Sequence, residues 1–136
     1  MKVSIPVGVK LSVEQCPKTQ EDEEDMSCVS YVSVVDSLMY AMVCTRLNIA
    51  HAVGVLSRYI SKPGKEHWTT VKRVFRYLCG TASYGLCYEG RPGLDRVVDI
   101  HGFVDADWAG DLDRRRSTSG YVFNLFGATI SWMRKI

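Results

Sequence analysis

The spacing of apolar residues predicts a helical first half of the chain. From Val29 to Met42 apolar residues recur every three to four positions, the period of an amphipathic helix. The same period predicts a second helix at Leu47–Ile60, with Thr45 or Asn48 capping its start, and a third at Lys65–Gly80. The apolar stripes are Tyr31, Val34, Val35, Leu38, Met39 and Met42, then Ile49, Val53, Leu56 and Ile60, then Trp68, Val71, Phe75 and Leu78.

After residue 80 the period changes to two, as in half-buried strands. Alternation predicts a short strand at Tyr84–Tyr88, and β-forming residues predict longer strands at Arg96–Asp105, Tyr121–Phe126 and Thr129–Met133. Short connections, with a turn at Gly127, favour antiparallel pairing. The predicted fold class is therefore α+β, a three-helix layer followed by an antiparallel β meander.

Residues 1–28 show neither period. They include two prolines and the acidic run Glu21–Asp25, so we expect a mostly extended or disordered lead-in, with a short strand around Val7–Leu11. The predicted organisation is this lead-in, a helical segment at 29–80 and a strand segment at 81–136.

The composition is that of an ordinary globular chain, with 136 residues, 46% hydrophobic and 24% charged. Five irregularly spaced cysteines favour reduced thiols over a secreted disulfide framework. The N-terminus lacks the continuous apolar core of a signal peptide, and no stretch has the length needed to cross a bilayer. We expect an intracellular protein of the cytoplasm or nucleus, not secreted and with no membrane partner.

The net charge is only +2, but the charges are segregated along the chain. Residues 46–80 carry seven Lys and Arg against one Glu, whereas residues 81–113 carry two Arg against seven acids. Such blocks fit a nucleic-acid backbone path beside a metal site, and they also fit ordinary solvated faces. The candidate phosphate contacts on the third helix are Lys72, Arg73 and Arg76.

Carboxylates gather where the predicted strand at 96–105 ends. They are Asp105, Asp107, Asp111 and Asp113, and a basic, hydroxyl-rich loop follows them. Carboxylate oxygens suit magnesium or manganese. Asp and Gly also gather wherever a strand turns into a loop, so the residues alone leave a metal site and a structural turn both open.

Three blocks in register carry a family resemblance, YVSVVDSLMYAMVCTRLNIAHAVGVLSRYISKPGKEHW, VKRVFRYLCGT and FVDADWAGDLDRRRSTSGYVFNLFGATISW. In order and spacing they resemble the Pol polyprotein of plant copia-type retrotransposons. The resemblance implies that the first two blocks lie after the reverse-transcriptase palm, in its thumb or connection region. It implies that the third block opens a ribonuclease H domain, with an incomplete ribonuclease H-like sheet.

The resemblance implies a catalytic ancestry for Asp105. Residues Val104–Trp108 match the family motif V-D-A-D-W, whose first Asp ends a strand and bridges two divalent metals during hydrolysis of RNA in RNA–DNA hybrids. The metal of the parent family is Mg²⁺ or Mn²⁺, and Asp107 ranks second as a ligand. The implied nucleic-acid contacts are Arg114, Arg115, Arg116, Ser117 and Ser119, with Gly120 allowing close approach, together with Lys72, Arg73 and Arg76.

The departures from the family pattern matter as well. The two-metal mechanism needs about four carboxylates, and the family supplies the others after the third strand, so we expect a fragment that binds no metal and has no catalysis of its own. Asp36 stands where the family has Gly, and a charge near a helix contact should loosen packing. Leu47 stands where the family has Pro at a helix start.

Three functions follow from the sequence. The first is an inactive Pol fragment whose parent copies RNA into DNA and cleaves hybrid RNA. The second is a non-catalytic module that binds nucleic acid or the rest of Pol. The third is a translated remnant without a stable fold, because an uncovered three-stranded sheet exposes apolar surface. The expected partners are an RNA–DNA hybrid or other nucleic acid and the rest of Pol, with no small-molecule substrate.

Overall fold

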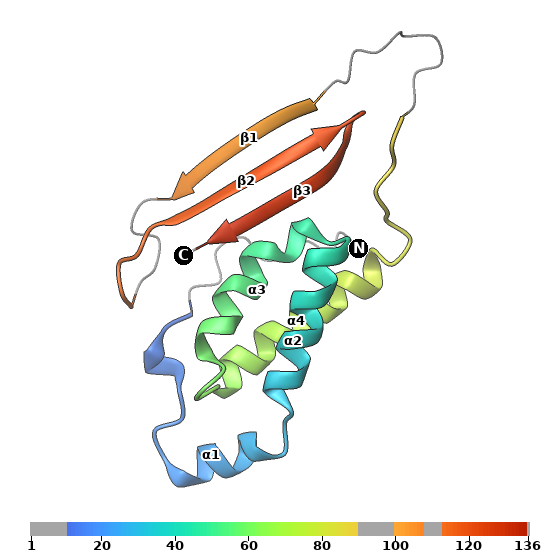
Figure 1. Cartoon of the computed structure of the whole chain (residues 1–136). Coiled ribbons are helices and arrows are strands. Elements are labelled where there is room, and N and C mark those ends of the chain that lie inside the picture. Colours follow the sequence, from blue (N-terminus) through green and yellow to red (C-terminus); the bar gives the residue numbers. More distant parts are fainter. Residues whose placement is uncertain (1–10, 90–99, 108–112, 136) are drawn as a thin grey trace, which may run out of the picture. The chain divides into compact units, whose positions relative to one another are not determined.

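The computed structural model describes residues 11–89, 100–107 and 113–135. The chain divides into two compact units between Ser83 and Tyr84. Helices make up the first unit and a three-stranded antiparallel sheet the second, which confirms the α+β class (Figure 1). Asp111, the start of the strand predicted at 96–105, and nearly all of the strand predicted at Val7–Leu11 lie outside the described residues.

The segment predicted to be extended or disordered contains a helix, α1 (Gln20–Ser27), so that prediction is wrong here. Thr19 caps α1, since its hydroxyl accepts a hydrogen bond from the Asp22 N–H at 3.3 Å. Three acids in the first turn stabilise α1, because their negative charges lie at the positive end of the helix dipole. Met26 is the buried residue of α1, and one buried residue cannot produce the periodic apolar pattern from which a helix is predicted.

Helices α2 (Tyr31–Cys44), α3 (Ala50–Leu56) and α4 (Lys65–Gly80) form the predicted helical layer. The second predicted helix is shorter than expected, because 3-10 turns at Leu47–Ile49 and Ser57–Tyr59 flank α3. No single described helix is long and apolar enough to span a bilayer; α1 and α2 meet that requirement only together, and they are bent by 56°.

Neither predicted cap of the second helix acts as one. The N-cap position of the first 3-10 turn is Arg46 and that of α3 is Ile49, without a capping side chain at either. Thr45 ends α2 instead, and the Asn48 side-chain amide donates to the Tyr77 hydroxyl on α4.

The core of the first unit lies between α2, α3 and α4. Its fully buried aliphatic side chains are Val35, Leu38, Ile49, Val53, Leu56, Val71 and Val74. The predicted stripes therefore mark the core, but they are too broad at their edges, because Met39 and Phe75 are each 39% exposed. Asp36 is also exposed on α2, so the expected loosening of a helix contact is wrong: its carboxylate stays in water and carries no burial cost.

Polar contacts complete this core. The buried Tyr31 hydroxyl donates to the Leu56 carbonyl at 3.0 Å, which satisfies a carbonyl at the end of α3. Burial raises the pKa of Tyr31 above its ordinary value, with a smaller contribution from Cys16. The hydroxyl therefore remains a donor at neutral pH, and α2 and α3 are joined by a hydrogen bond as well as by packing.

Helix α4 is held at both ends. At its start the buried His67 accepts the Gly64 N–H at Nδ1, 2.8 Å away, and stacks on Tyr59 with ring centroids 4.1 Å apart. At its end the Arg46 guanidinium donates to the Thr81 carbonyl at 2.8 Å, where a cation complements the negative end of the helix dipole. These contacts fix the orientation of the exposed face of α4.

Strands β1 (Ile100–Asp107), β2 (Thr118–Leu125) and β3 (Ala128–Lys135) form the sheet in the order β1-β2-β3, which confirms an antiparallel meander for these strands. Phe126 and Gly127 make the last turn with φ of 49° and 81°, in the left-handed region that Gly adopts without strain. Adjacent residues Phe103 and Val104 are 59% and 83% exposed, so β1 presents apolar side chains on both faces.

The short strand predicted at Tyr84–Tyr88 is wrong, because residues 84–89 have no regular strand pairing. Two isolated hydrogen bonds replace a ladder. The Glu89 N–H donates to the Phe126 carbonyl at 3.2 Å, and the Tyr88 hydroxyl donates to the Thr129 carbonyl at 2.8 Å. The alternating residues 84–88 therefore lie beside the sheet but are not one of its strands.

Candidate nucleic-acid interface

The exposed face of α4 carries a row of cations. Lys72, Arg73 and Arg76 are exposed, whereas His67 and Val71 on the opposite side are fully buried. At 3.6 residues per turn Lys72 and Arg76 follow one another along the axis, and Lys65 lies on the same line two turns earlier. We call Lys65, Lys72 and Arg76, with the neighbouring Arg73, the basic row.

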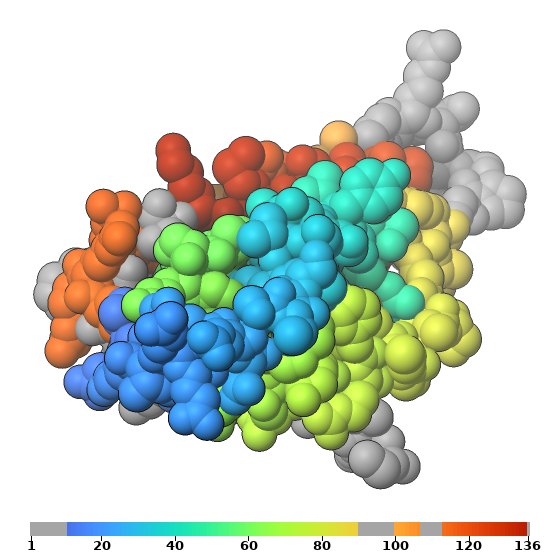
Figure 2. All heavy atoms as spheres, turned by 90° about the horizontal axis from the view of Figure 1, so that it is seen from below, coloured from blue at the N-terminus to red at the C-terminus, as the bar shows by residue number. Residues whose placement is uncertain are grey.

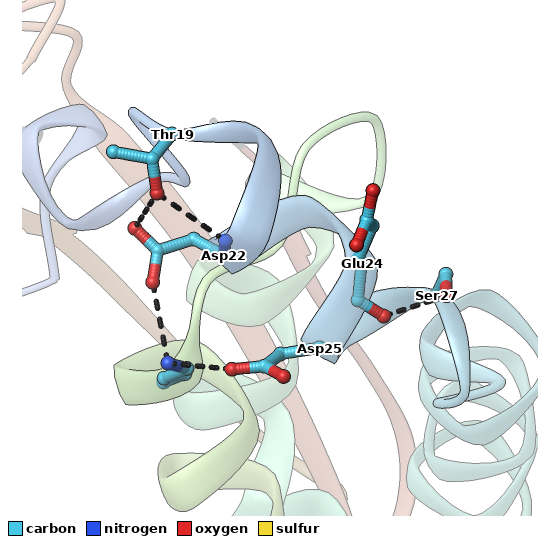
Figure 3. A network of polar contacts seen from close by, with 6 residues as sticks. Thr19, Asp22, Glu24, Asp25 and Ser27 are labelled. Carbon is cyan, nitrogen blue, oxygen red and sulfur yellow. Dashed lines mark hydrogen bonds and ion pairs between the residues drawn. The ribbon is translucent and has the colours of Figure 1, made fainter.

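Helix α1 neutralises the first cation of this row. The carboxylates of Asp22 and Asp25 contact the Lys65 amine at 3.2 and 2.9 Å. Figure 3 shows the two carboxylates on two sides of one amine. A further pair joins Lys62, just before α4, to Glu23 of α1 at 2.7 Å. Sequence reasoning missed these pairs, since an acidic run and a distant basic helix give no signal of their pairing.

The pKa directions agree with this geometry. Asp25 and then Asp22 raise the pKa of Lys65, and Glu23 raises that of Lys62. The pKa of Asp22 is lowered, first by the hydrogen bond from Thr19 and then by Lys65. A carboxyl whose pKa is lower in the folded state than in the unfolded state stabilises the fold at a pH above its unfolded-state pKa. This stabilisation is lost as the pH falls through the folded-state pKa. The contacts are therefore present at neutral pH.

The rest of the row, Lys72, Arg73 and Arg76, has no acidic partner in the part of the chain that the structure describes. Instead the Arg76 Nε donates to the Lys72 carbonyl at 3.4 Å, which keeps the guanidinium along the helix. The second half of α4 therefore presents a compact positive surface.

The predicted acidic site lies on β1 in the other unit. Asp105 is exposed and pairs in register with Gly120 of β2, and Asp107 ends the strand opposite Thr118. In the described part of the chain, no group of three or more His, Cys, Asp or Glu side chains is placed to hold a metal ion.

The predicted contacts after β1 lie partly in a loop and partly in β2. Arg114, Arg115, Arg116 and Ser117 are exposed in the loop before β2, with Arg115 in the left-handed region at φ 53°. Ser119 lies within β2 in register with Ala106, and Asp105 is the neighbour of Ala106. Because side chains alternate along a strand, Ser119 and Asp105 belong to opposite faces of the sheet. The predicted contact at Ser119 and the predicted metal ligand Asp105 therefore lie on different faces of the sheet.

No protein-family model matches the chain, and no solved structure matches it. Among known proteins, the chain is 50% identical to the retrovirus-related Pol polyprotein from transposon TNT 1-94 of Nicotiana tabacum, over 98% of this chain and 10% of that protein. It is 40% identical to the retrovirus-related Pol polyprotein from transposon RE2 of Arabidopsis thaliana, over 77% of this chain and 7% of that protein. The chain thus spans a tenth or less of these two relatives.

A third relative is much shorter. The secreted RxLR effector protein 161 of Plasmopara viticola is 51% identical over 81% of this chain and 75% of that protein. With half of its residues shared over nearly its full length, the chain is homologous to a segment of the retrovirus-related Pol polyproteins of plant transposons.

Proposed function

We propose that this chain is a nucleic-acid-binding segment of a transposon Pol polyprotein that contacts the phosphodiester backbone through α4 and performs no catalysis by itself. The single observation behind the proposal is the cluster of Lys72, Arg73 and Arg76, exposed and without acidic partners among the described residues. Cations on a rigid helix attract phosphates without reading base sequence.

In this proposal residues 29–80 correspond to the reverse-transcriptase thumb or connection region. Residues 81–136 correspond to the opening strands of a ribonuclease H-like domain. The resemblance of the three sequence blocks supports this division, and the natural ligand would be an RNA–DNA hybrid held near the rest of Pol. The Arg114–Ser117 loop is a second contact surface in the proposal. We also propose that the protein is intracellular.

The spacing of the row suits a nucleic-acid strand. Residues four apart on a helix are separated by about 6 Å along its axis. Phosphates recur about every 3.4 Å along the axis of one strand of a duplex. Lys72 and Arg76 are thus far enough apart to contact different phosphates, while Arg73 projects to one side of them.

Lys72→Gln is expected to weaken binding to an RNA–DNA hybrid by about threefold to tenfold at low salt, and to lower the slope of log K against log salt by about 0.9, because one released counterion is lost. Fluorescence anisotropy at several salt concentrations measures both quantities. Lys18→Gln is the matched control, since Lys18 is also exposed but lies away from α4 in the sequence. Equal effects of the two changes would contradict the assignment of the contact to α4.

The chain is expected to leave a hybrid uncleaved in the presence of Mg²⁺ or Mn²⁺. Asp105 and Asp107 supply too few carboxylates for two metals, and the described residues offer no cluster that completes the set. A gel assay with labelled hybrid RNA measures cleavage. Metal-dependent products that disappear in Asp105→Asn would show that the chain is a nuclease and that this part of the proposal is wrong.

A further inference from the structure

Three acids of α1 form ion pairs with two lysines, Lys65 at the start of the basic row and Lys62 just before α4. Asp22 and Asp25 contact the Lys65 amine, and Glu23 contacts Lys62, at distances of 2.7 to 3.2 Å. The Lys65 side chain is still 61% exposed, so it is accessible to a ligand that displaces the carboxylates. The acids hold the lysine without burying it.

The first unit is built so that α1 reaches this place. Figure 2 shows the blue N-terminal segment lying beside the yellow-green atoms of the chain region that contains α4. Gly64, just before α4, approaches the Gln15 carbonyl so closely that an added Cβ would lie 1.9 Å from that oxygen. This contact anchors the segment leading to α1, and Thr19 then sets the start of the acidic helix.

We propose that α1 acts as an intramolecular substitute for the nucleic-acid backbone, occupying Lys65 at the start of the basic row until phosphates displace its carboxylates. This inference rests on the proposed function, because it assigns a regulator to the same surface. In the masked state nucleic acid contacts Lys72, Arg73 and Arg76. In the released state the row extends to Lys65, about 16 Å before Arg76 along the helix axis.

The size of the effect follows from the exposure of the ion pairs. Exposed pairs are individually weak, which makes α1 displaceable rather than a permanent cover. Removing both contacts to Lys65 should therefore raise affinity for nucleic acid by about threefold to tenfold. It should also steepen the salt dependence by about 0.9, because one more phosphate is neutralised.

The test compares two double variants of the same helix. Asp22→Asn/Asp25→Asn removes both carboxylates from Lys65. Glu21→Gln/Glu24→Gln makes the same change in net charge, and Figure 3 shows the Glu24 side chain pointing away from these contacts. Anisotropy titrations with a labelled RNA–DNA hybrid measure affinity and salt slope, and circular dichroism confirms that each variant keeps its helices.

We expect the tighter binding and steeper slope in Asp22→Asn/Asp25→Asn, and a change of less than about twofold in the control, whose charges act only through screened solvent. Lys65→Gln should weaken binding less in the wild-type chain than in the released variant, where it should abolish the gain. If the chain binds hybrid and the two double variants behave equally, the masking by α1 is wrong, while the proposed function still stands. Absence of binding by every variant at low salt would instead reject the proposed function.

Discussion

Gly64→Ala is expected to destabilise the helical unit by about 1–3 kcal/mol, the usual cost of inserting a methyl group where no space exists. The added Cβ would lie 1.9 Å from the Gln15 carbonyl oxygen and 3.1 Å from its carbon. Both atoms belong to backbone and cannot rotate away as a side chain would. The N-terminal segment must therefore separate from α4, and urea unfolding followed by circular dichroism measures the loss.

Gly54→Ala in α3 is the control for this substitution. Among the described residues, no atom other than those of its chain neighbours and of its own helix backbone lies within 4 Å of the added Cβ. Replacing an interior helical Gly by Ala raises stability by about 0.5–1 kcal/mol. The two changes have the same chemistry and opposite expected signs. Equal stability of Gly64→Ala and the wild-type chain would contradict the close contact between Gly64 and Gln15.

Leu38→Ala is expected to lower the free energy of unfolding by about 2–5 kcal/mol, through lost transfer energy and the cavity left behind. Leu38 is 2% exposed on the inner side of α2. A loss of this size is a large share of the stability of a small domain. The expected result is a cooperative transition displaced to lower urea concentration with an unchanged slope.

Val43→Ala provides the comparison on the same helix. Val43 is 65% exposed, so its substitution should change stability by less than about 0.5 kcal/mol. A broad, noncooperative transition in the wild-type chain would support the third sequence hypothesis, a remnant without a stable fold. The dense core between α2, α3 and α4 argues for the cooperative outcome.

The sequence predicted the elements whose apolar period is strong. Val35, Leu38 and Val71 lie where a helical stripe places them, and α4 has the predicted bounds. Val74 is also buried, although the predicted stripe did not include it. Helix α1 was missed because its stability comes from a Thr19 cap and from pairs with distant lysines, neither of which produces a hydrophobic pattern. Alternation at Tyr84–Tyr88 was misleading because a strand also needs a backbone partner.

The candidate site shows the same division. The positions of Lys72, Arg73 and Arg76 on the outer face of α4 follow directly from helical periodicity. The neutralisation of Lys65 depends on residues about 40 positions away, joined only by the tertiary fold. For Asp105, the residues indicated a strand end rich in carboxylates, and only the resemblance to Pol polyproteins implied a catalytic ancestor.

The salt dependence of binding to an RNA–DNA hybrid tests the central claim most directly, because it counts the phosphates that the chain neutralises. The chain should bind the hybrid at low salt, with log K falling linearly with log salt, and Lys72→Gln/Arg76→Gln should reduce that slope by about 1.8, or 0.9 for each lost contact. A slope that is unchanged in the double variant, or no binding at low salt, would contradict a nucleic-acid interface on α4.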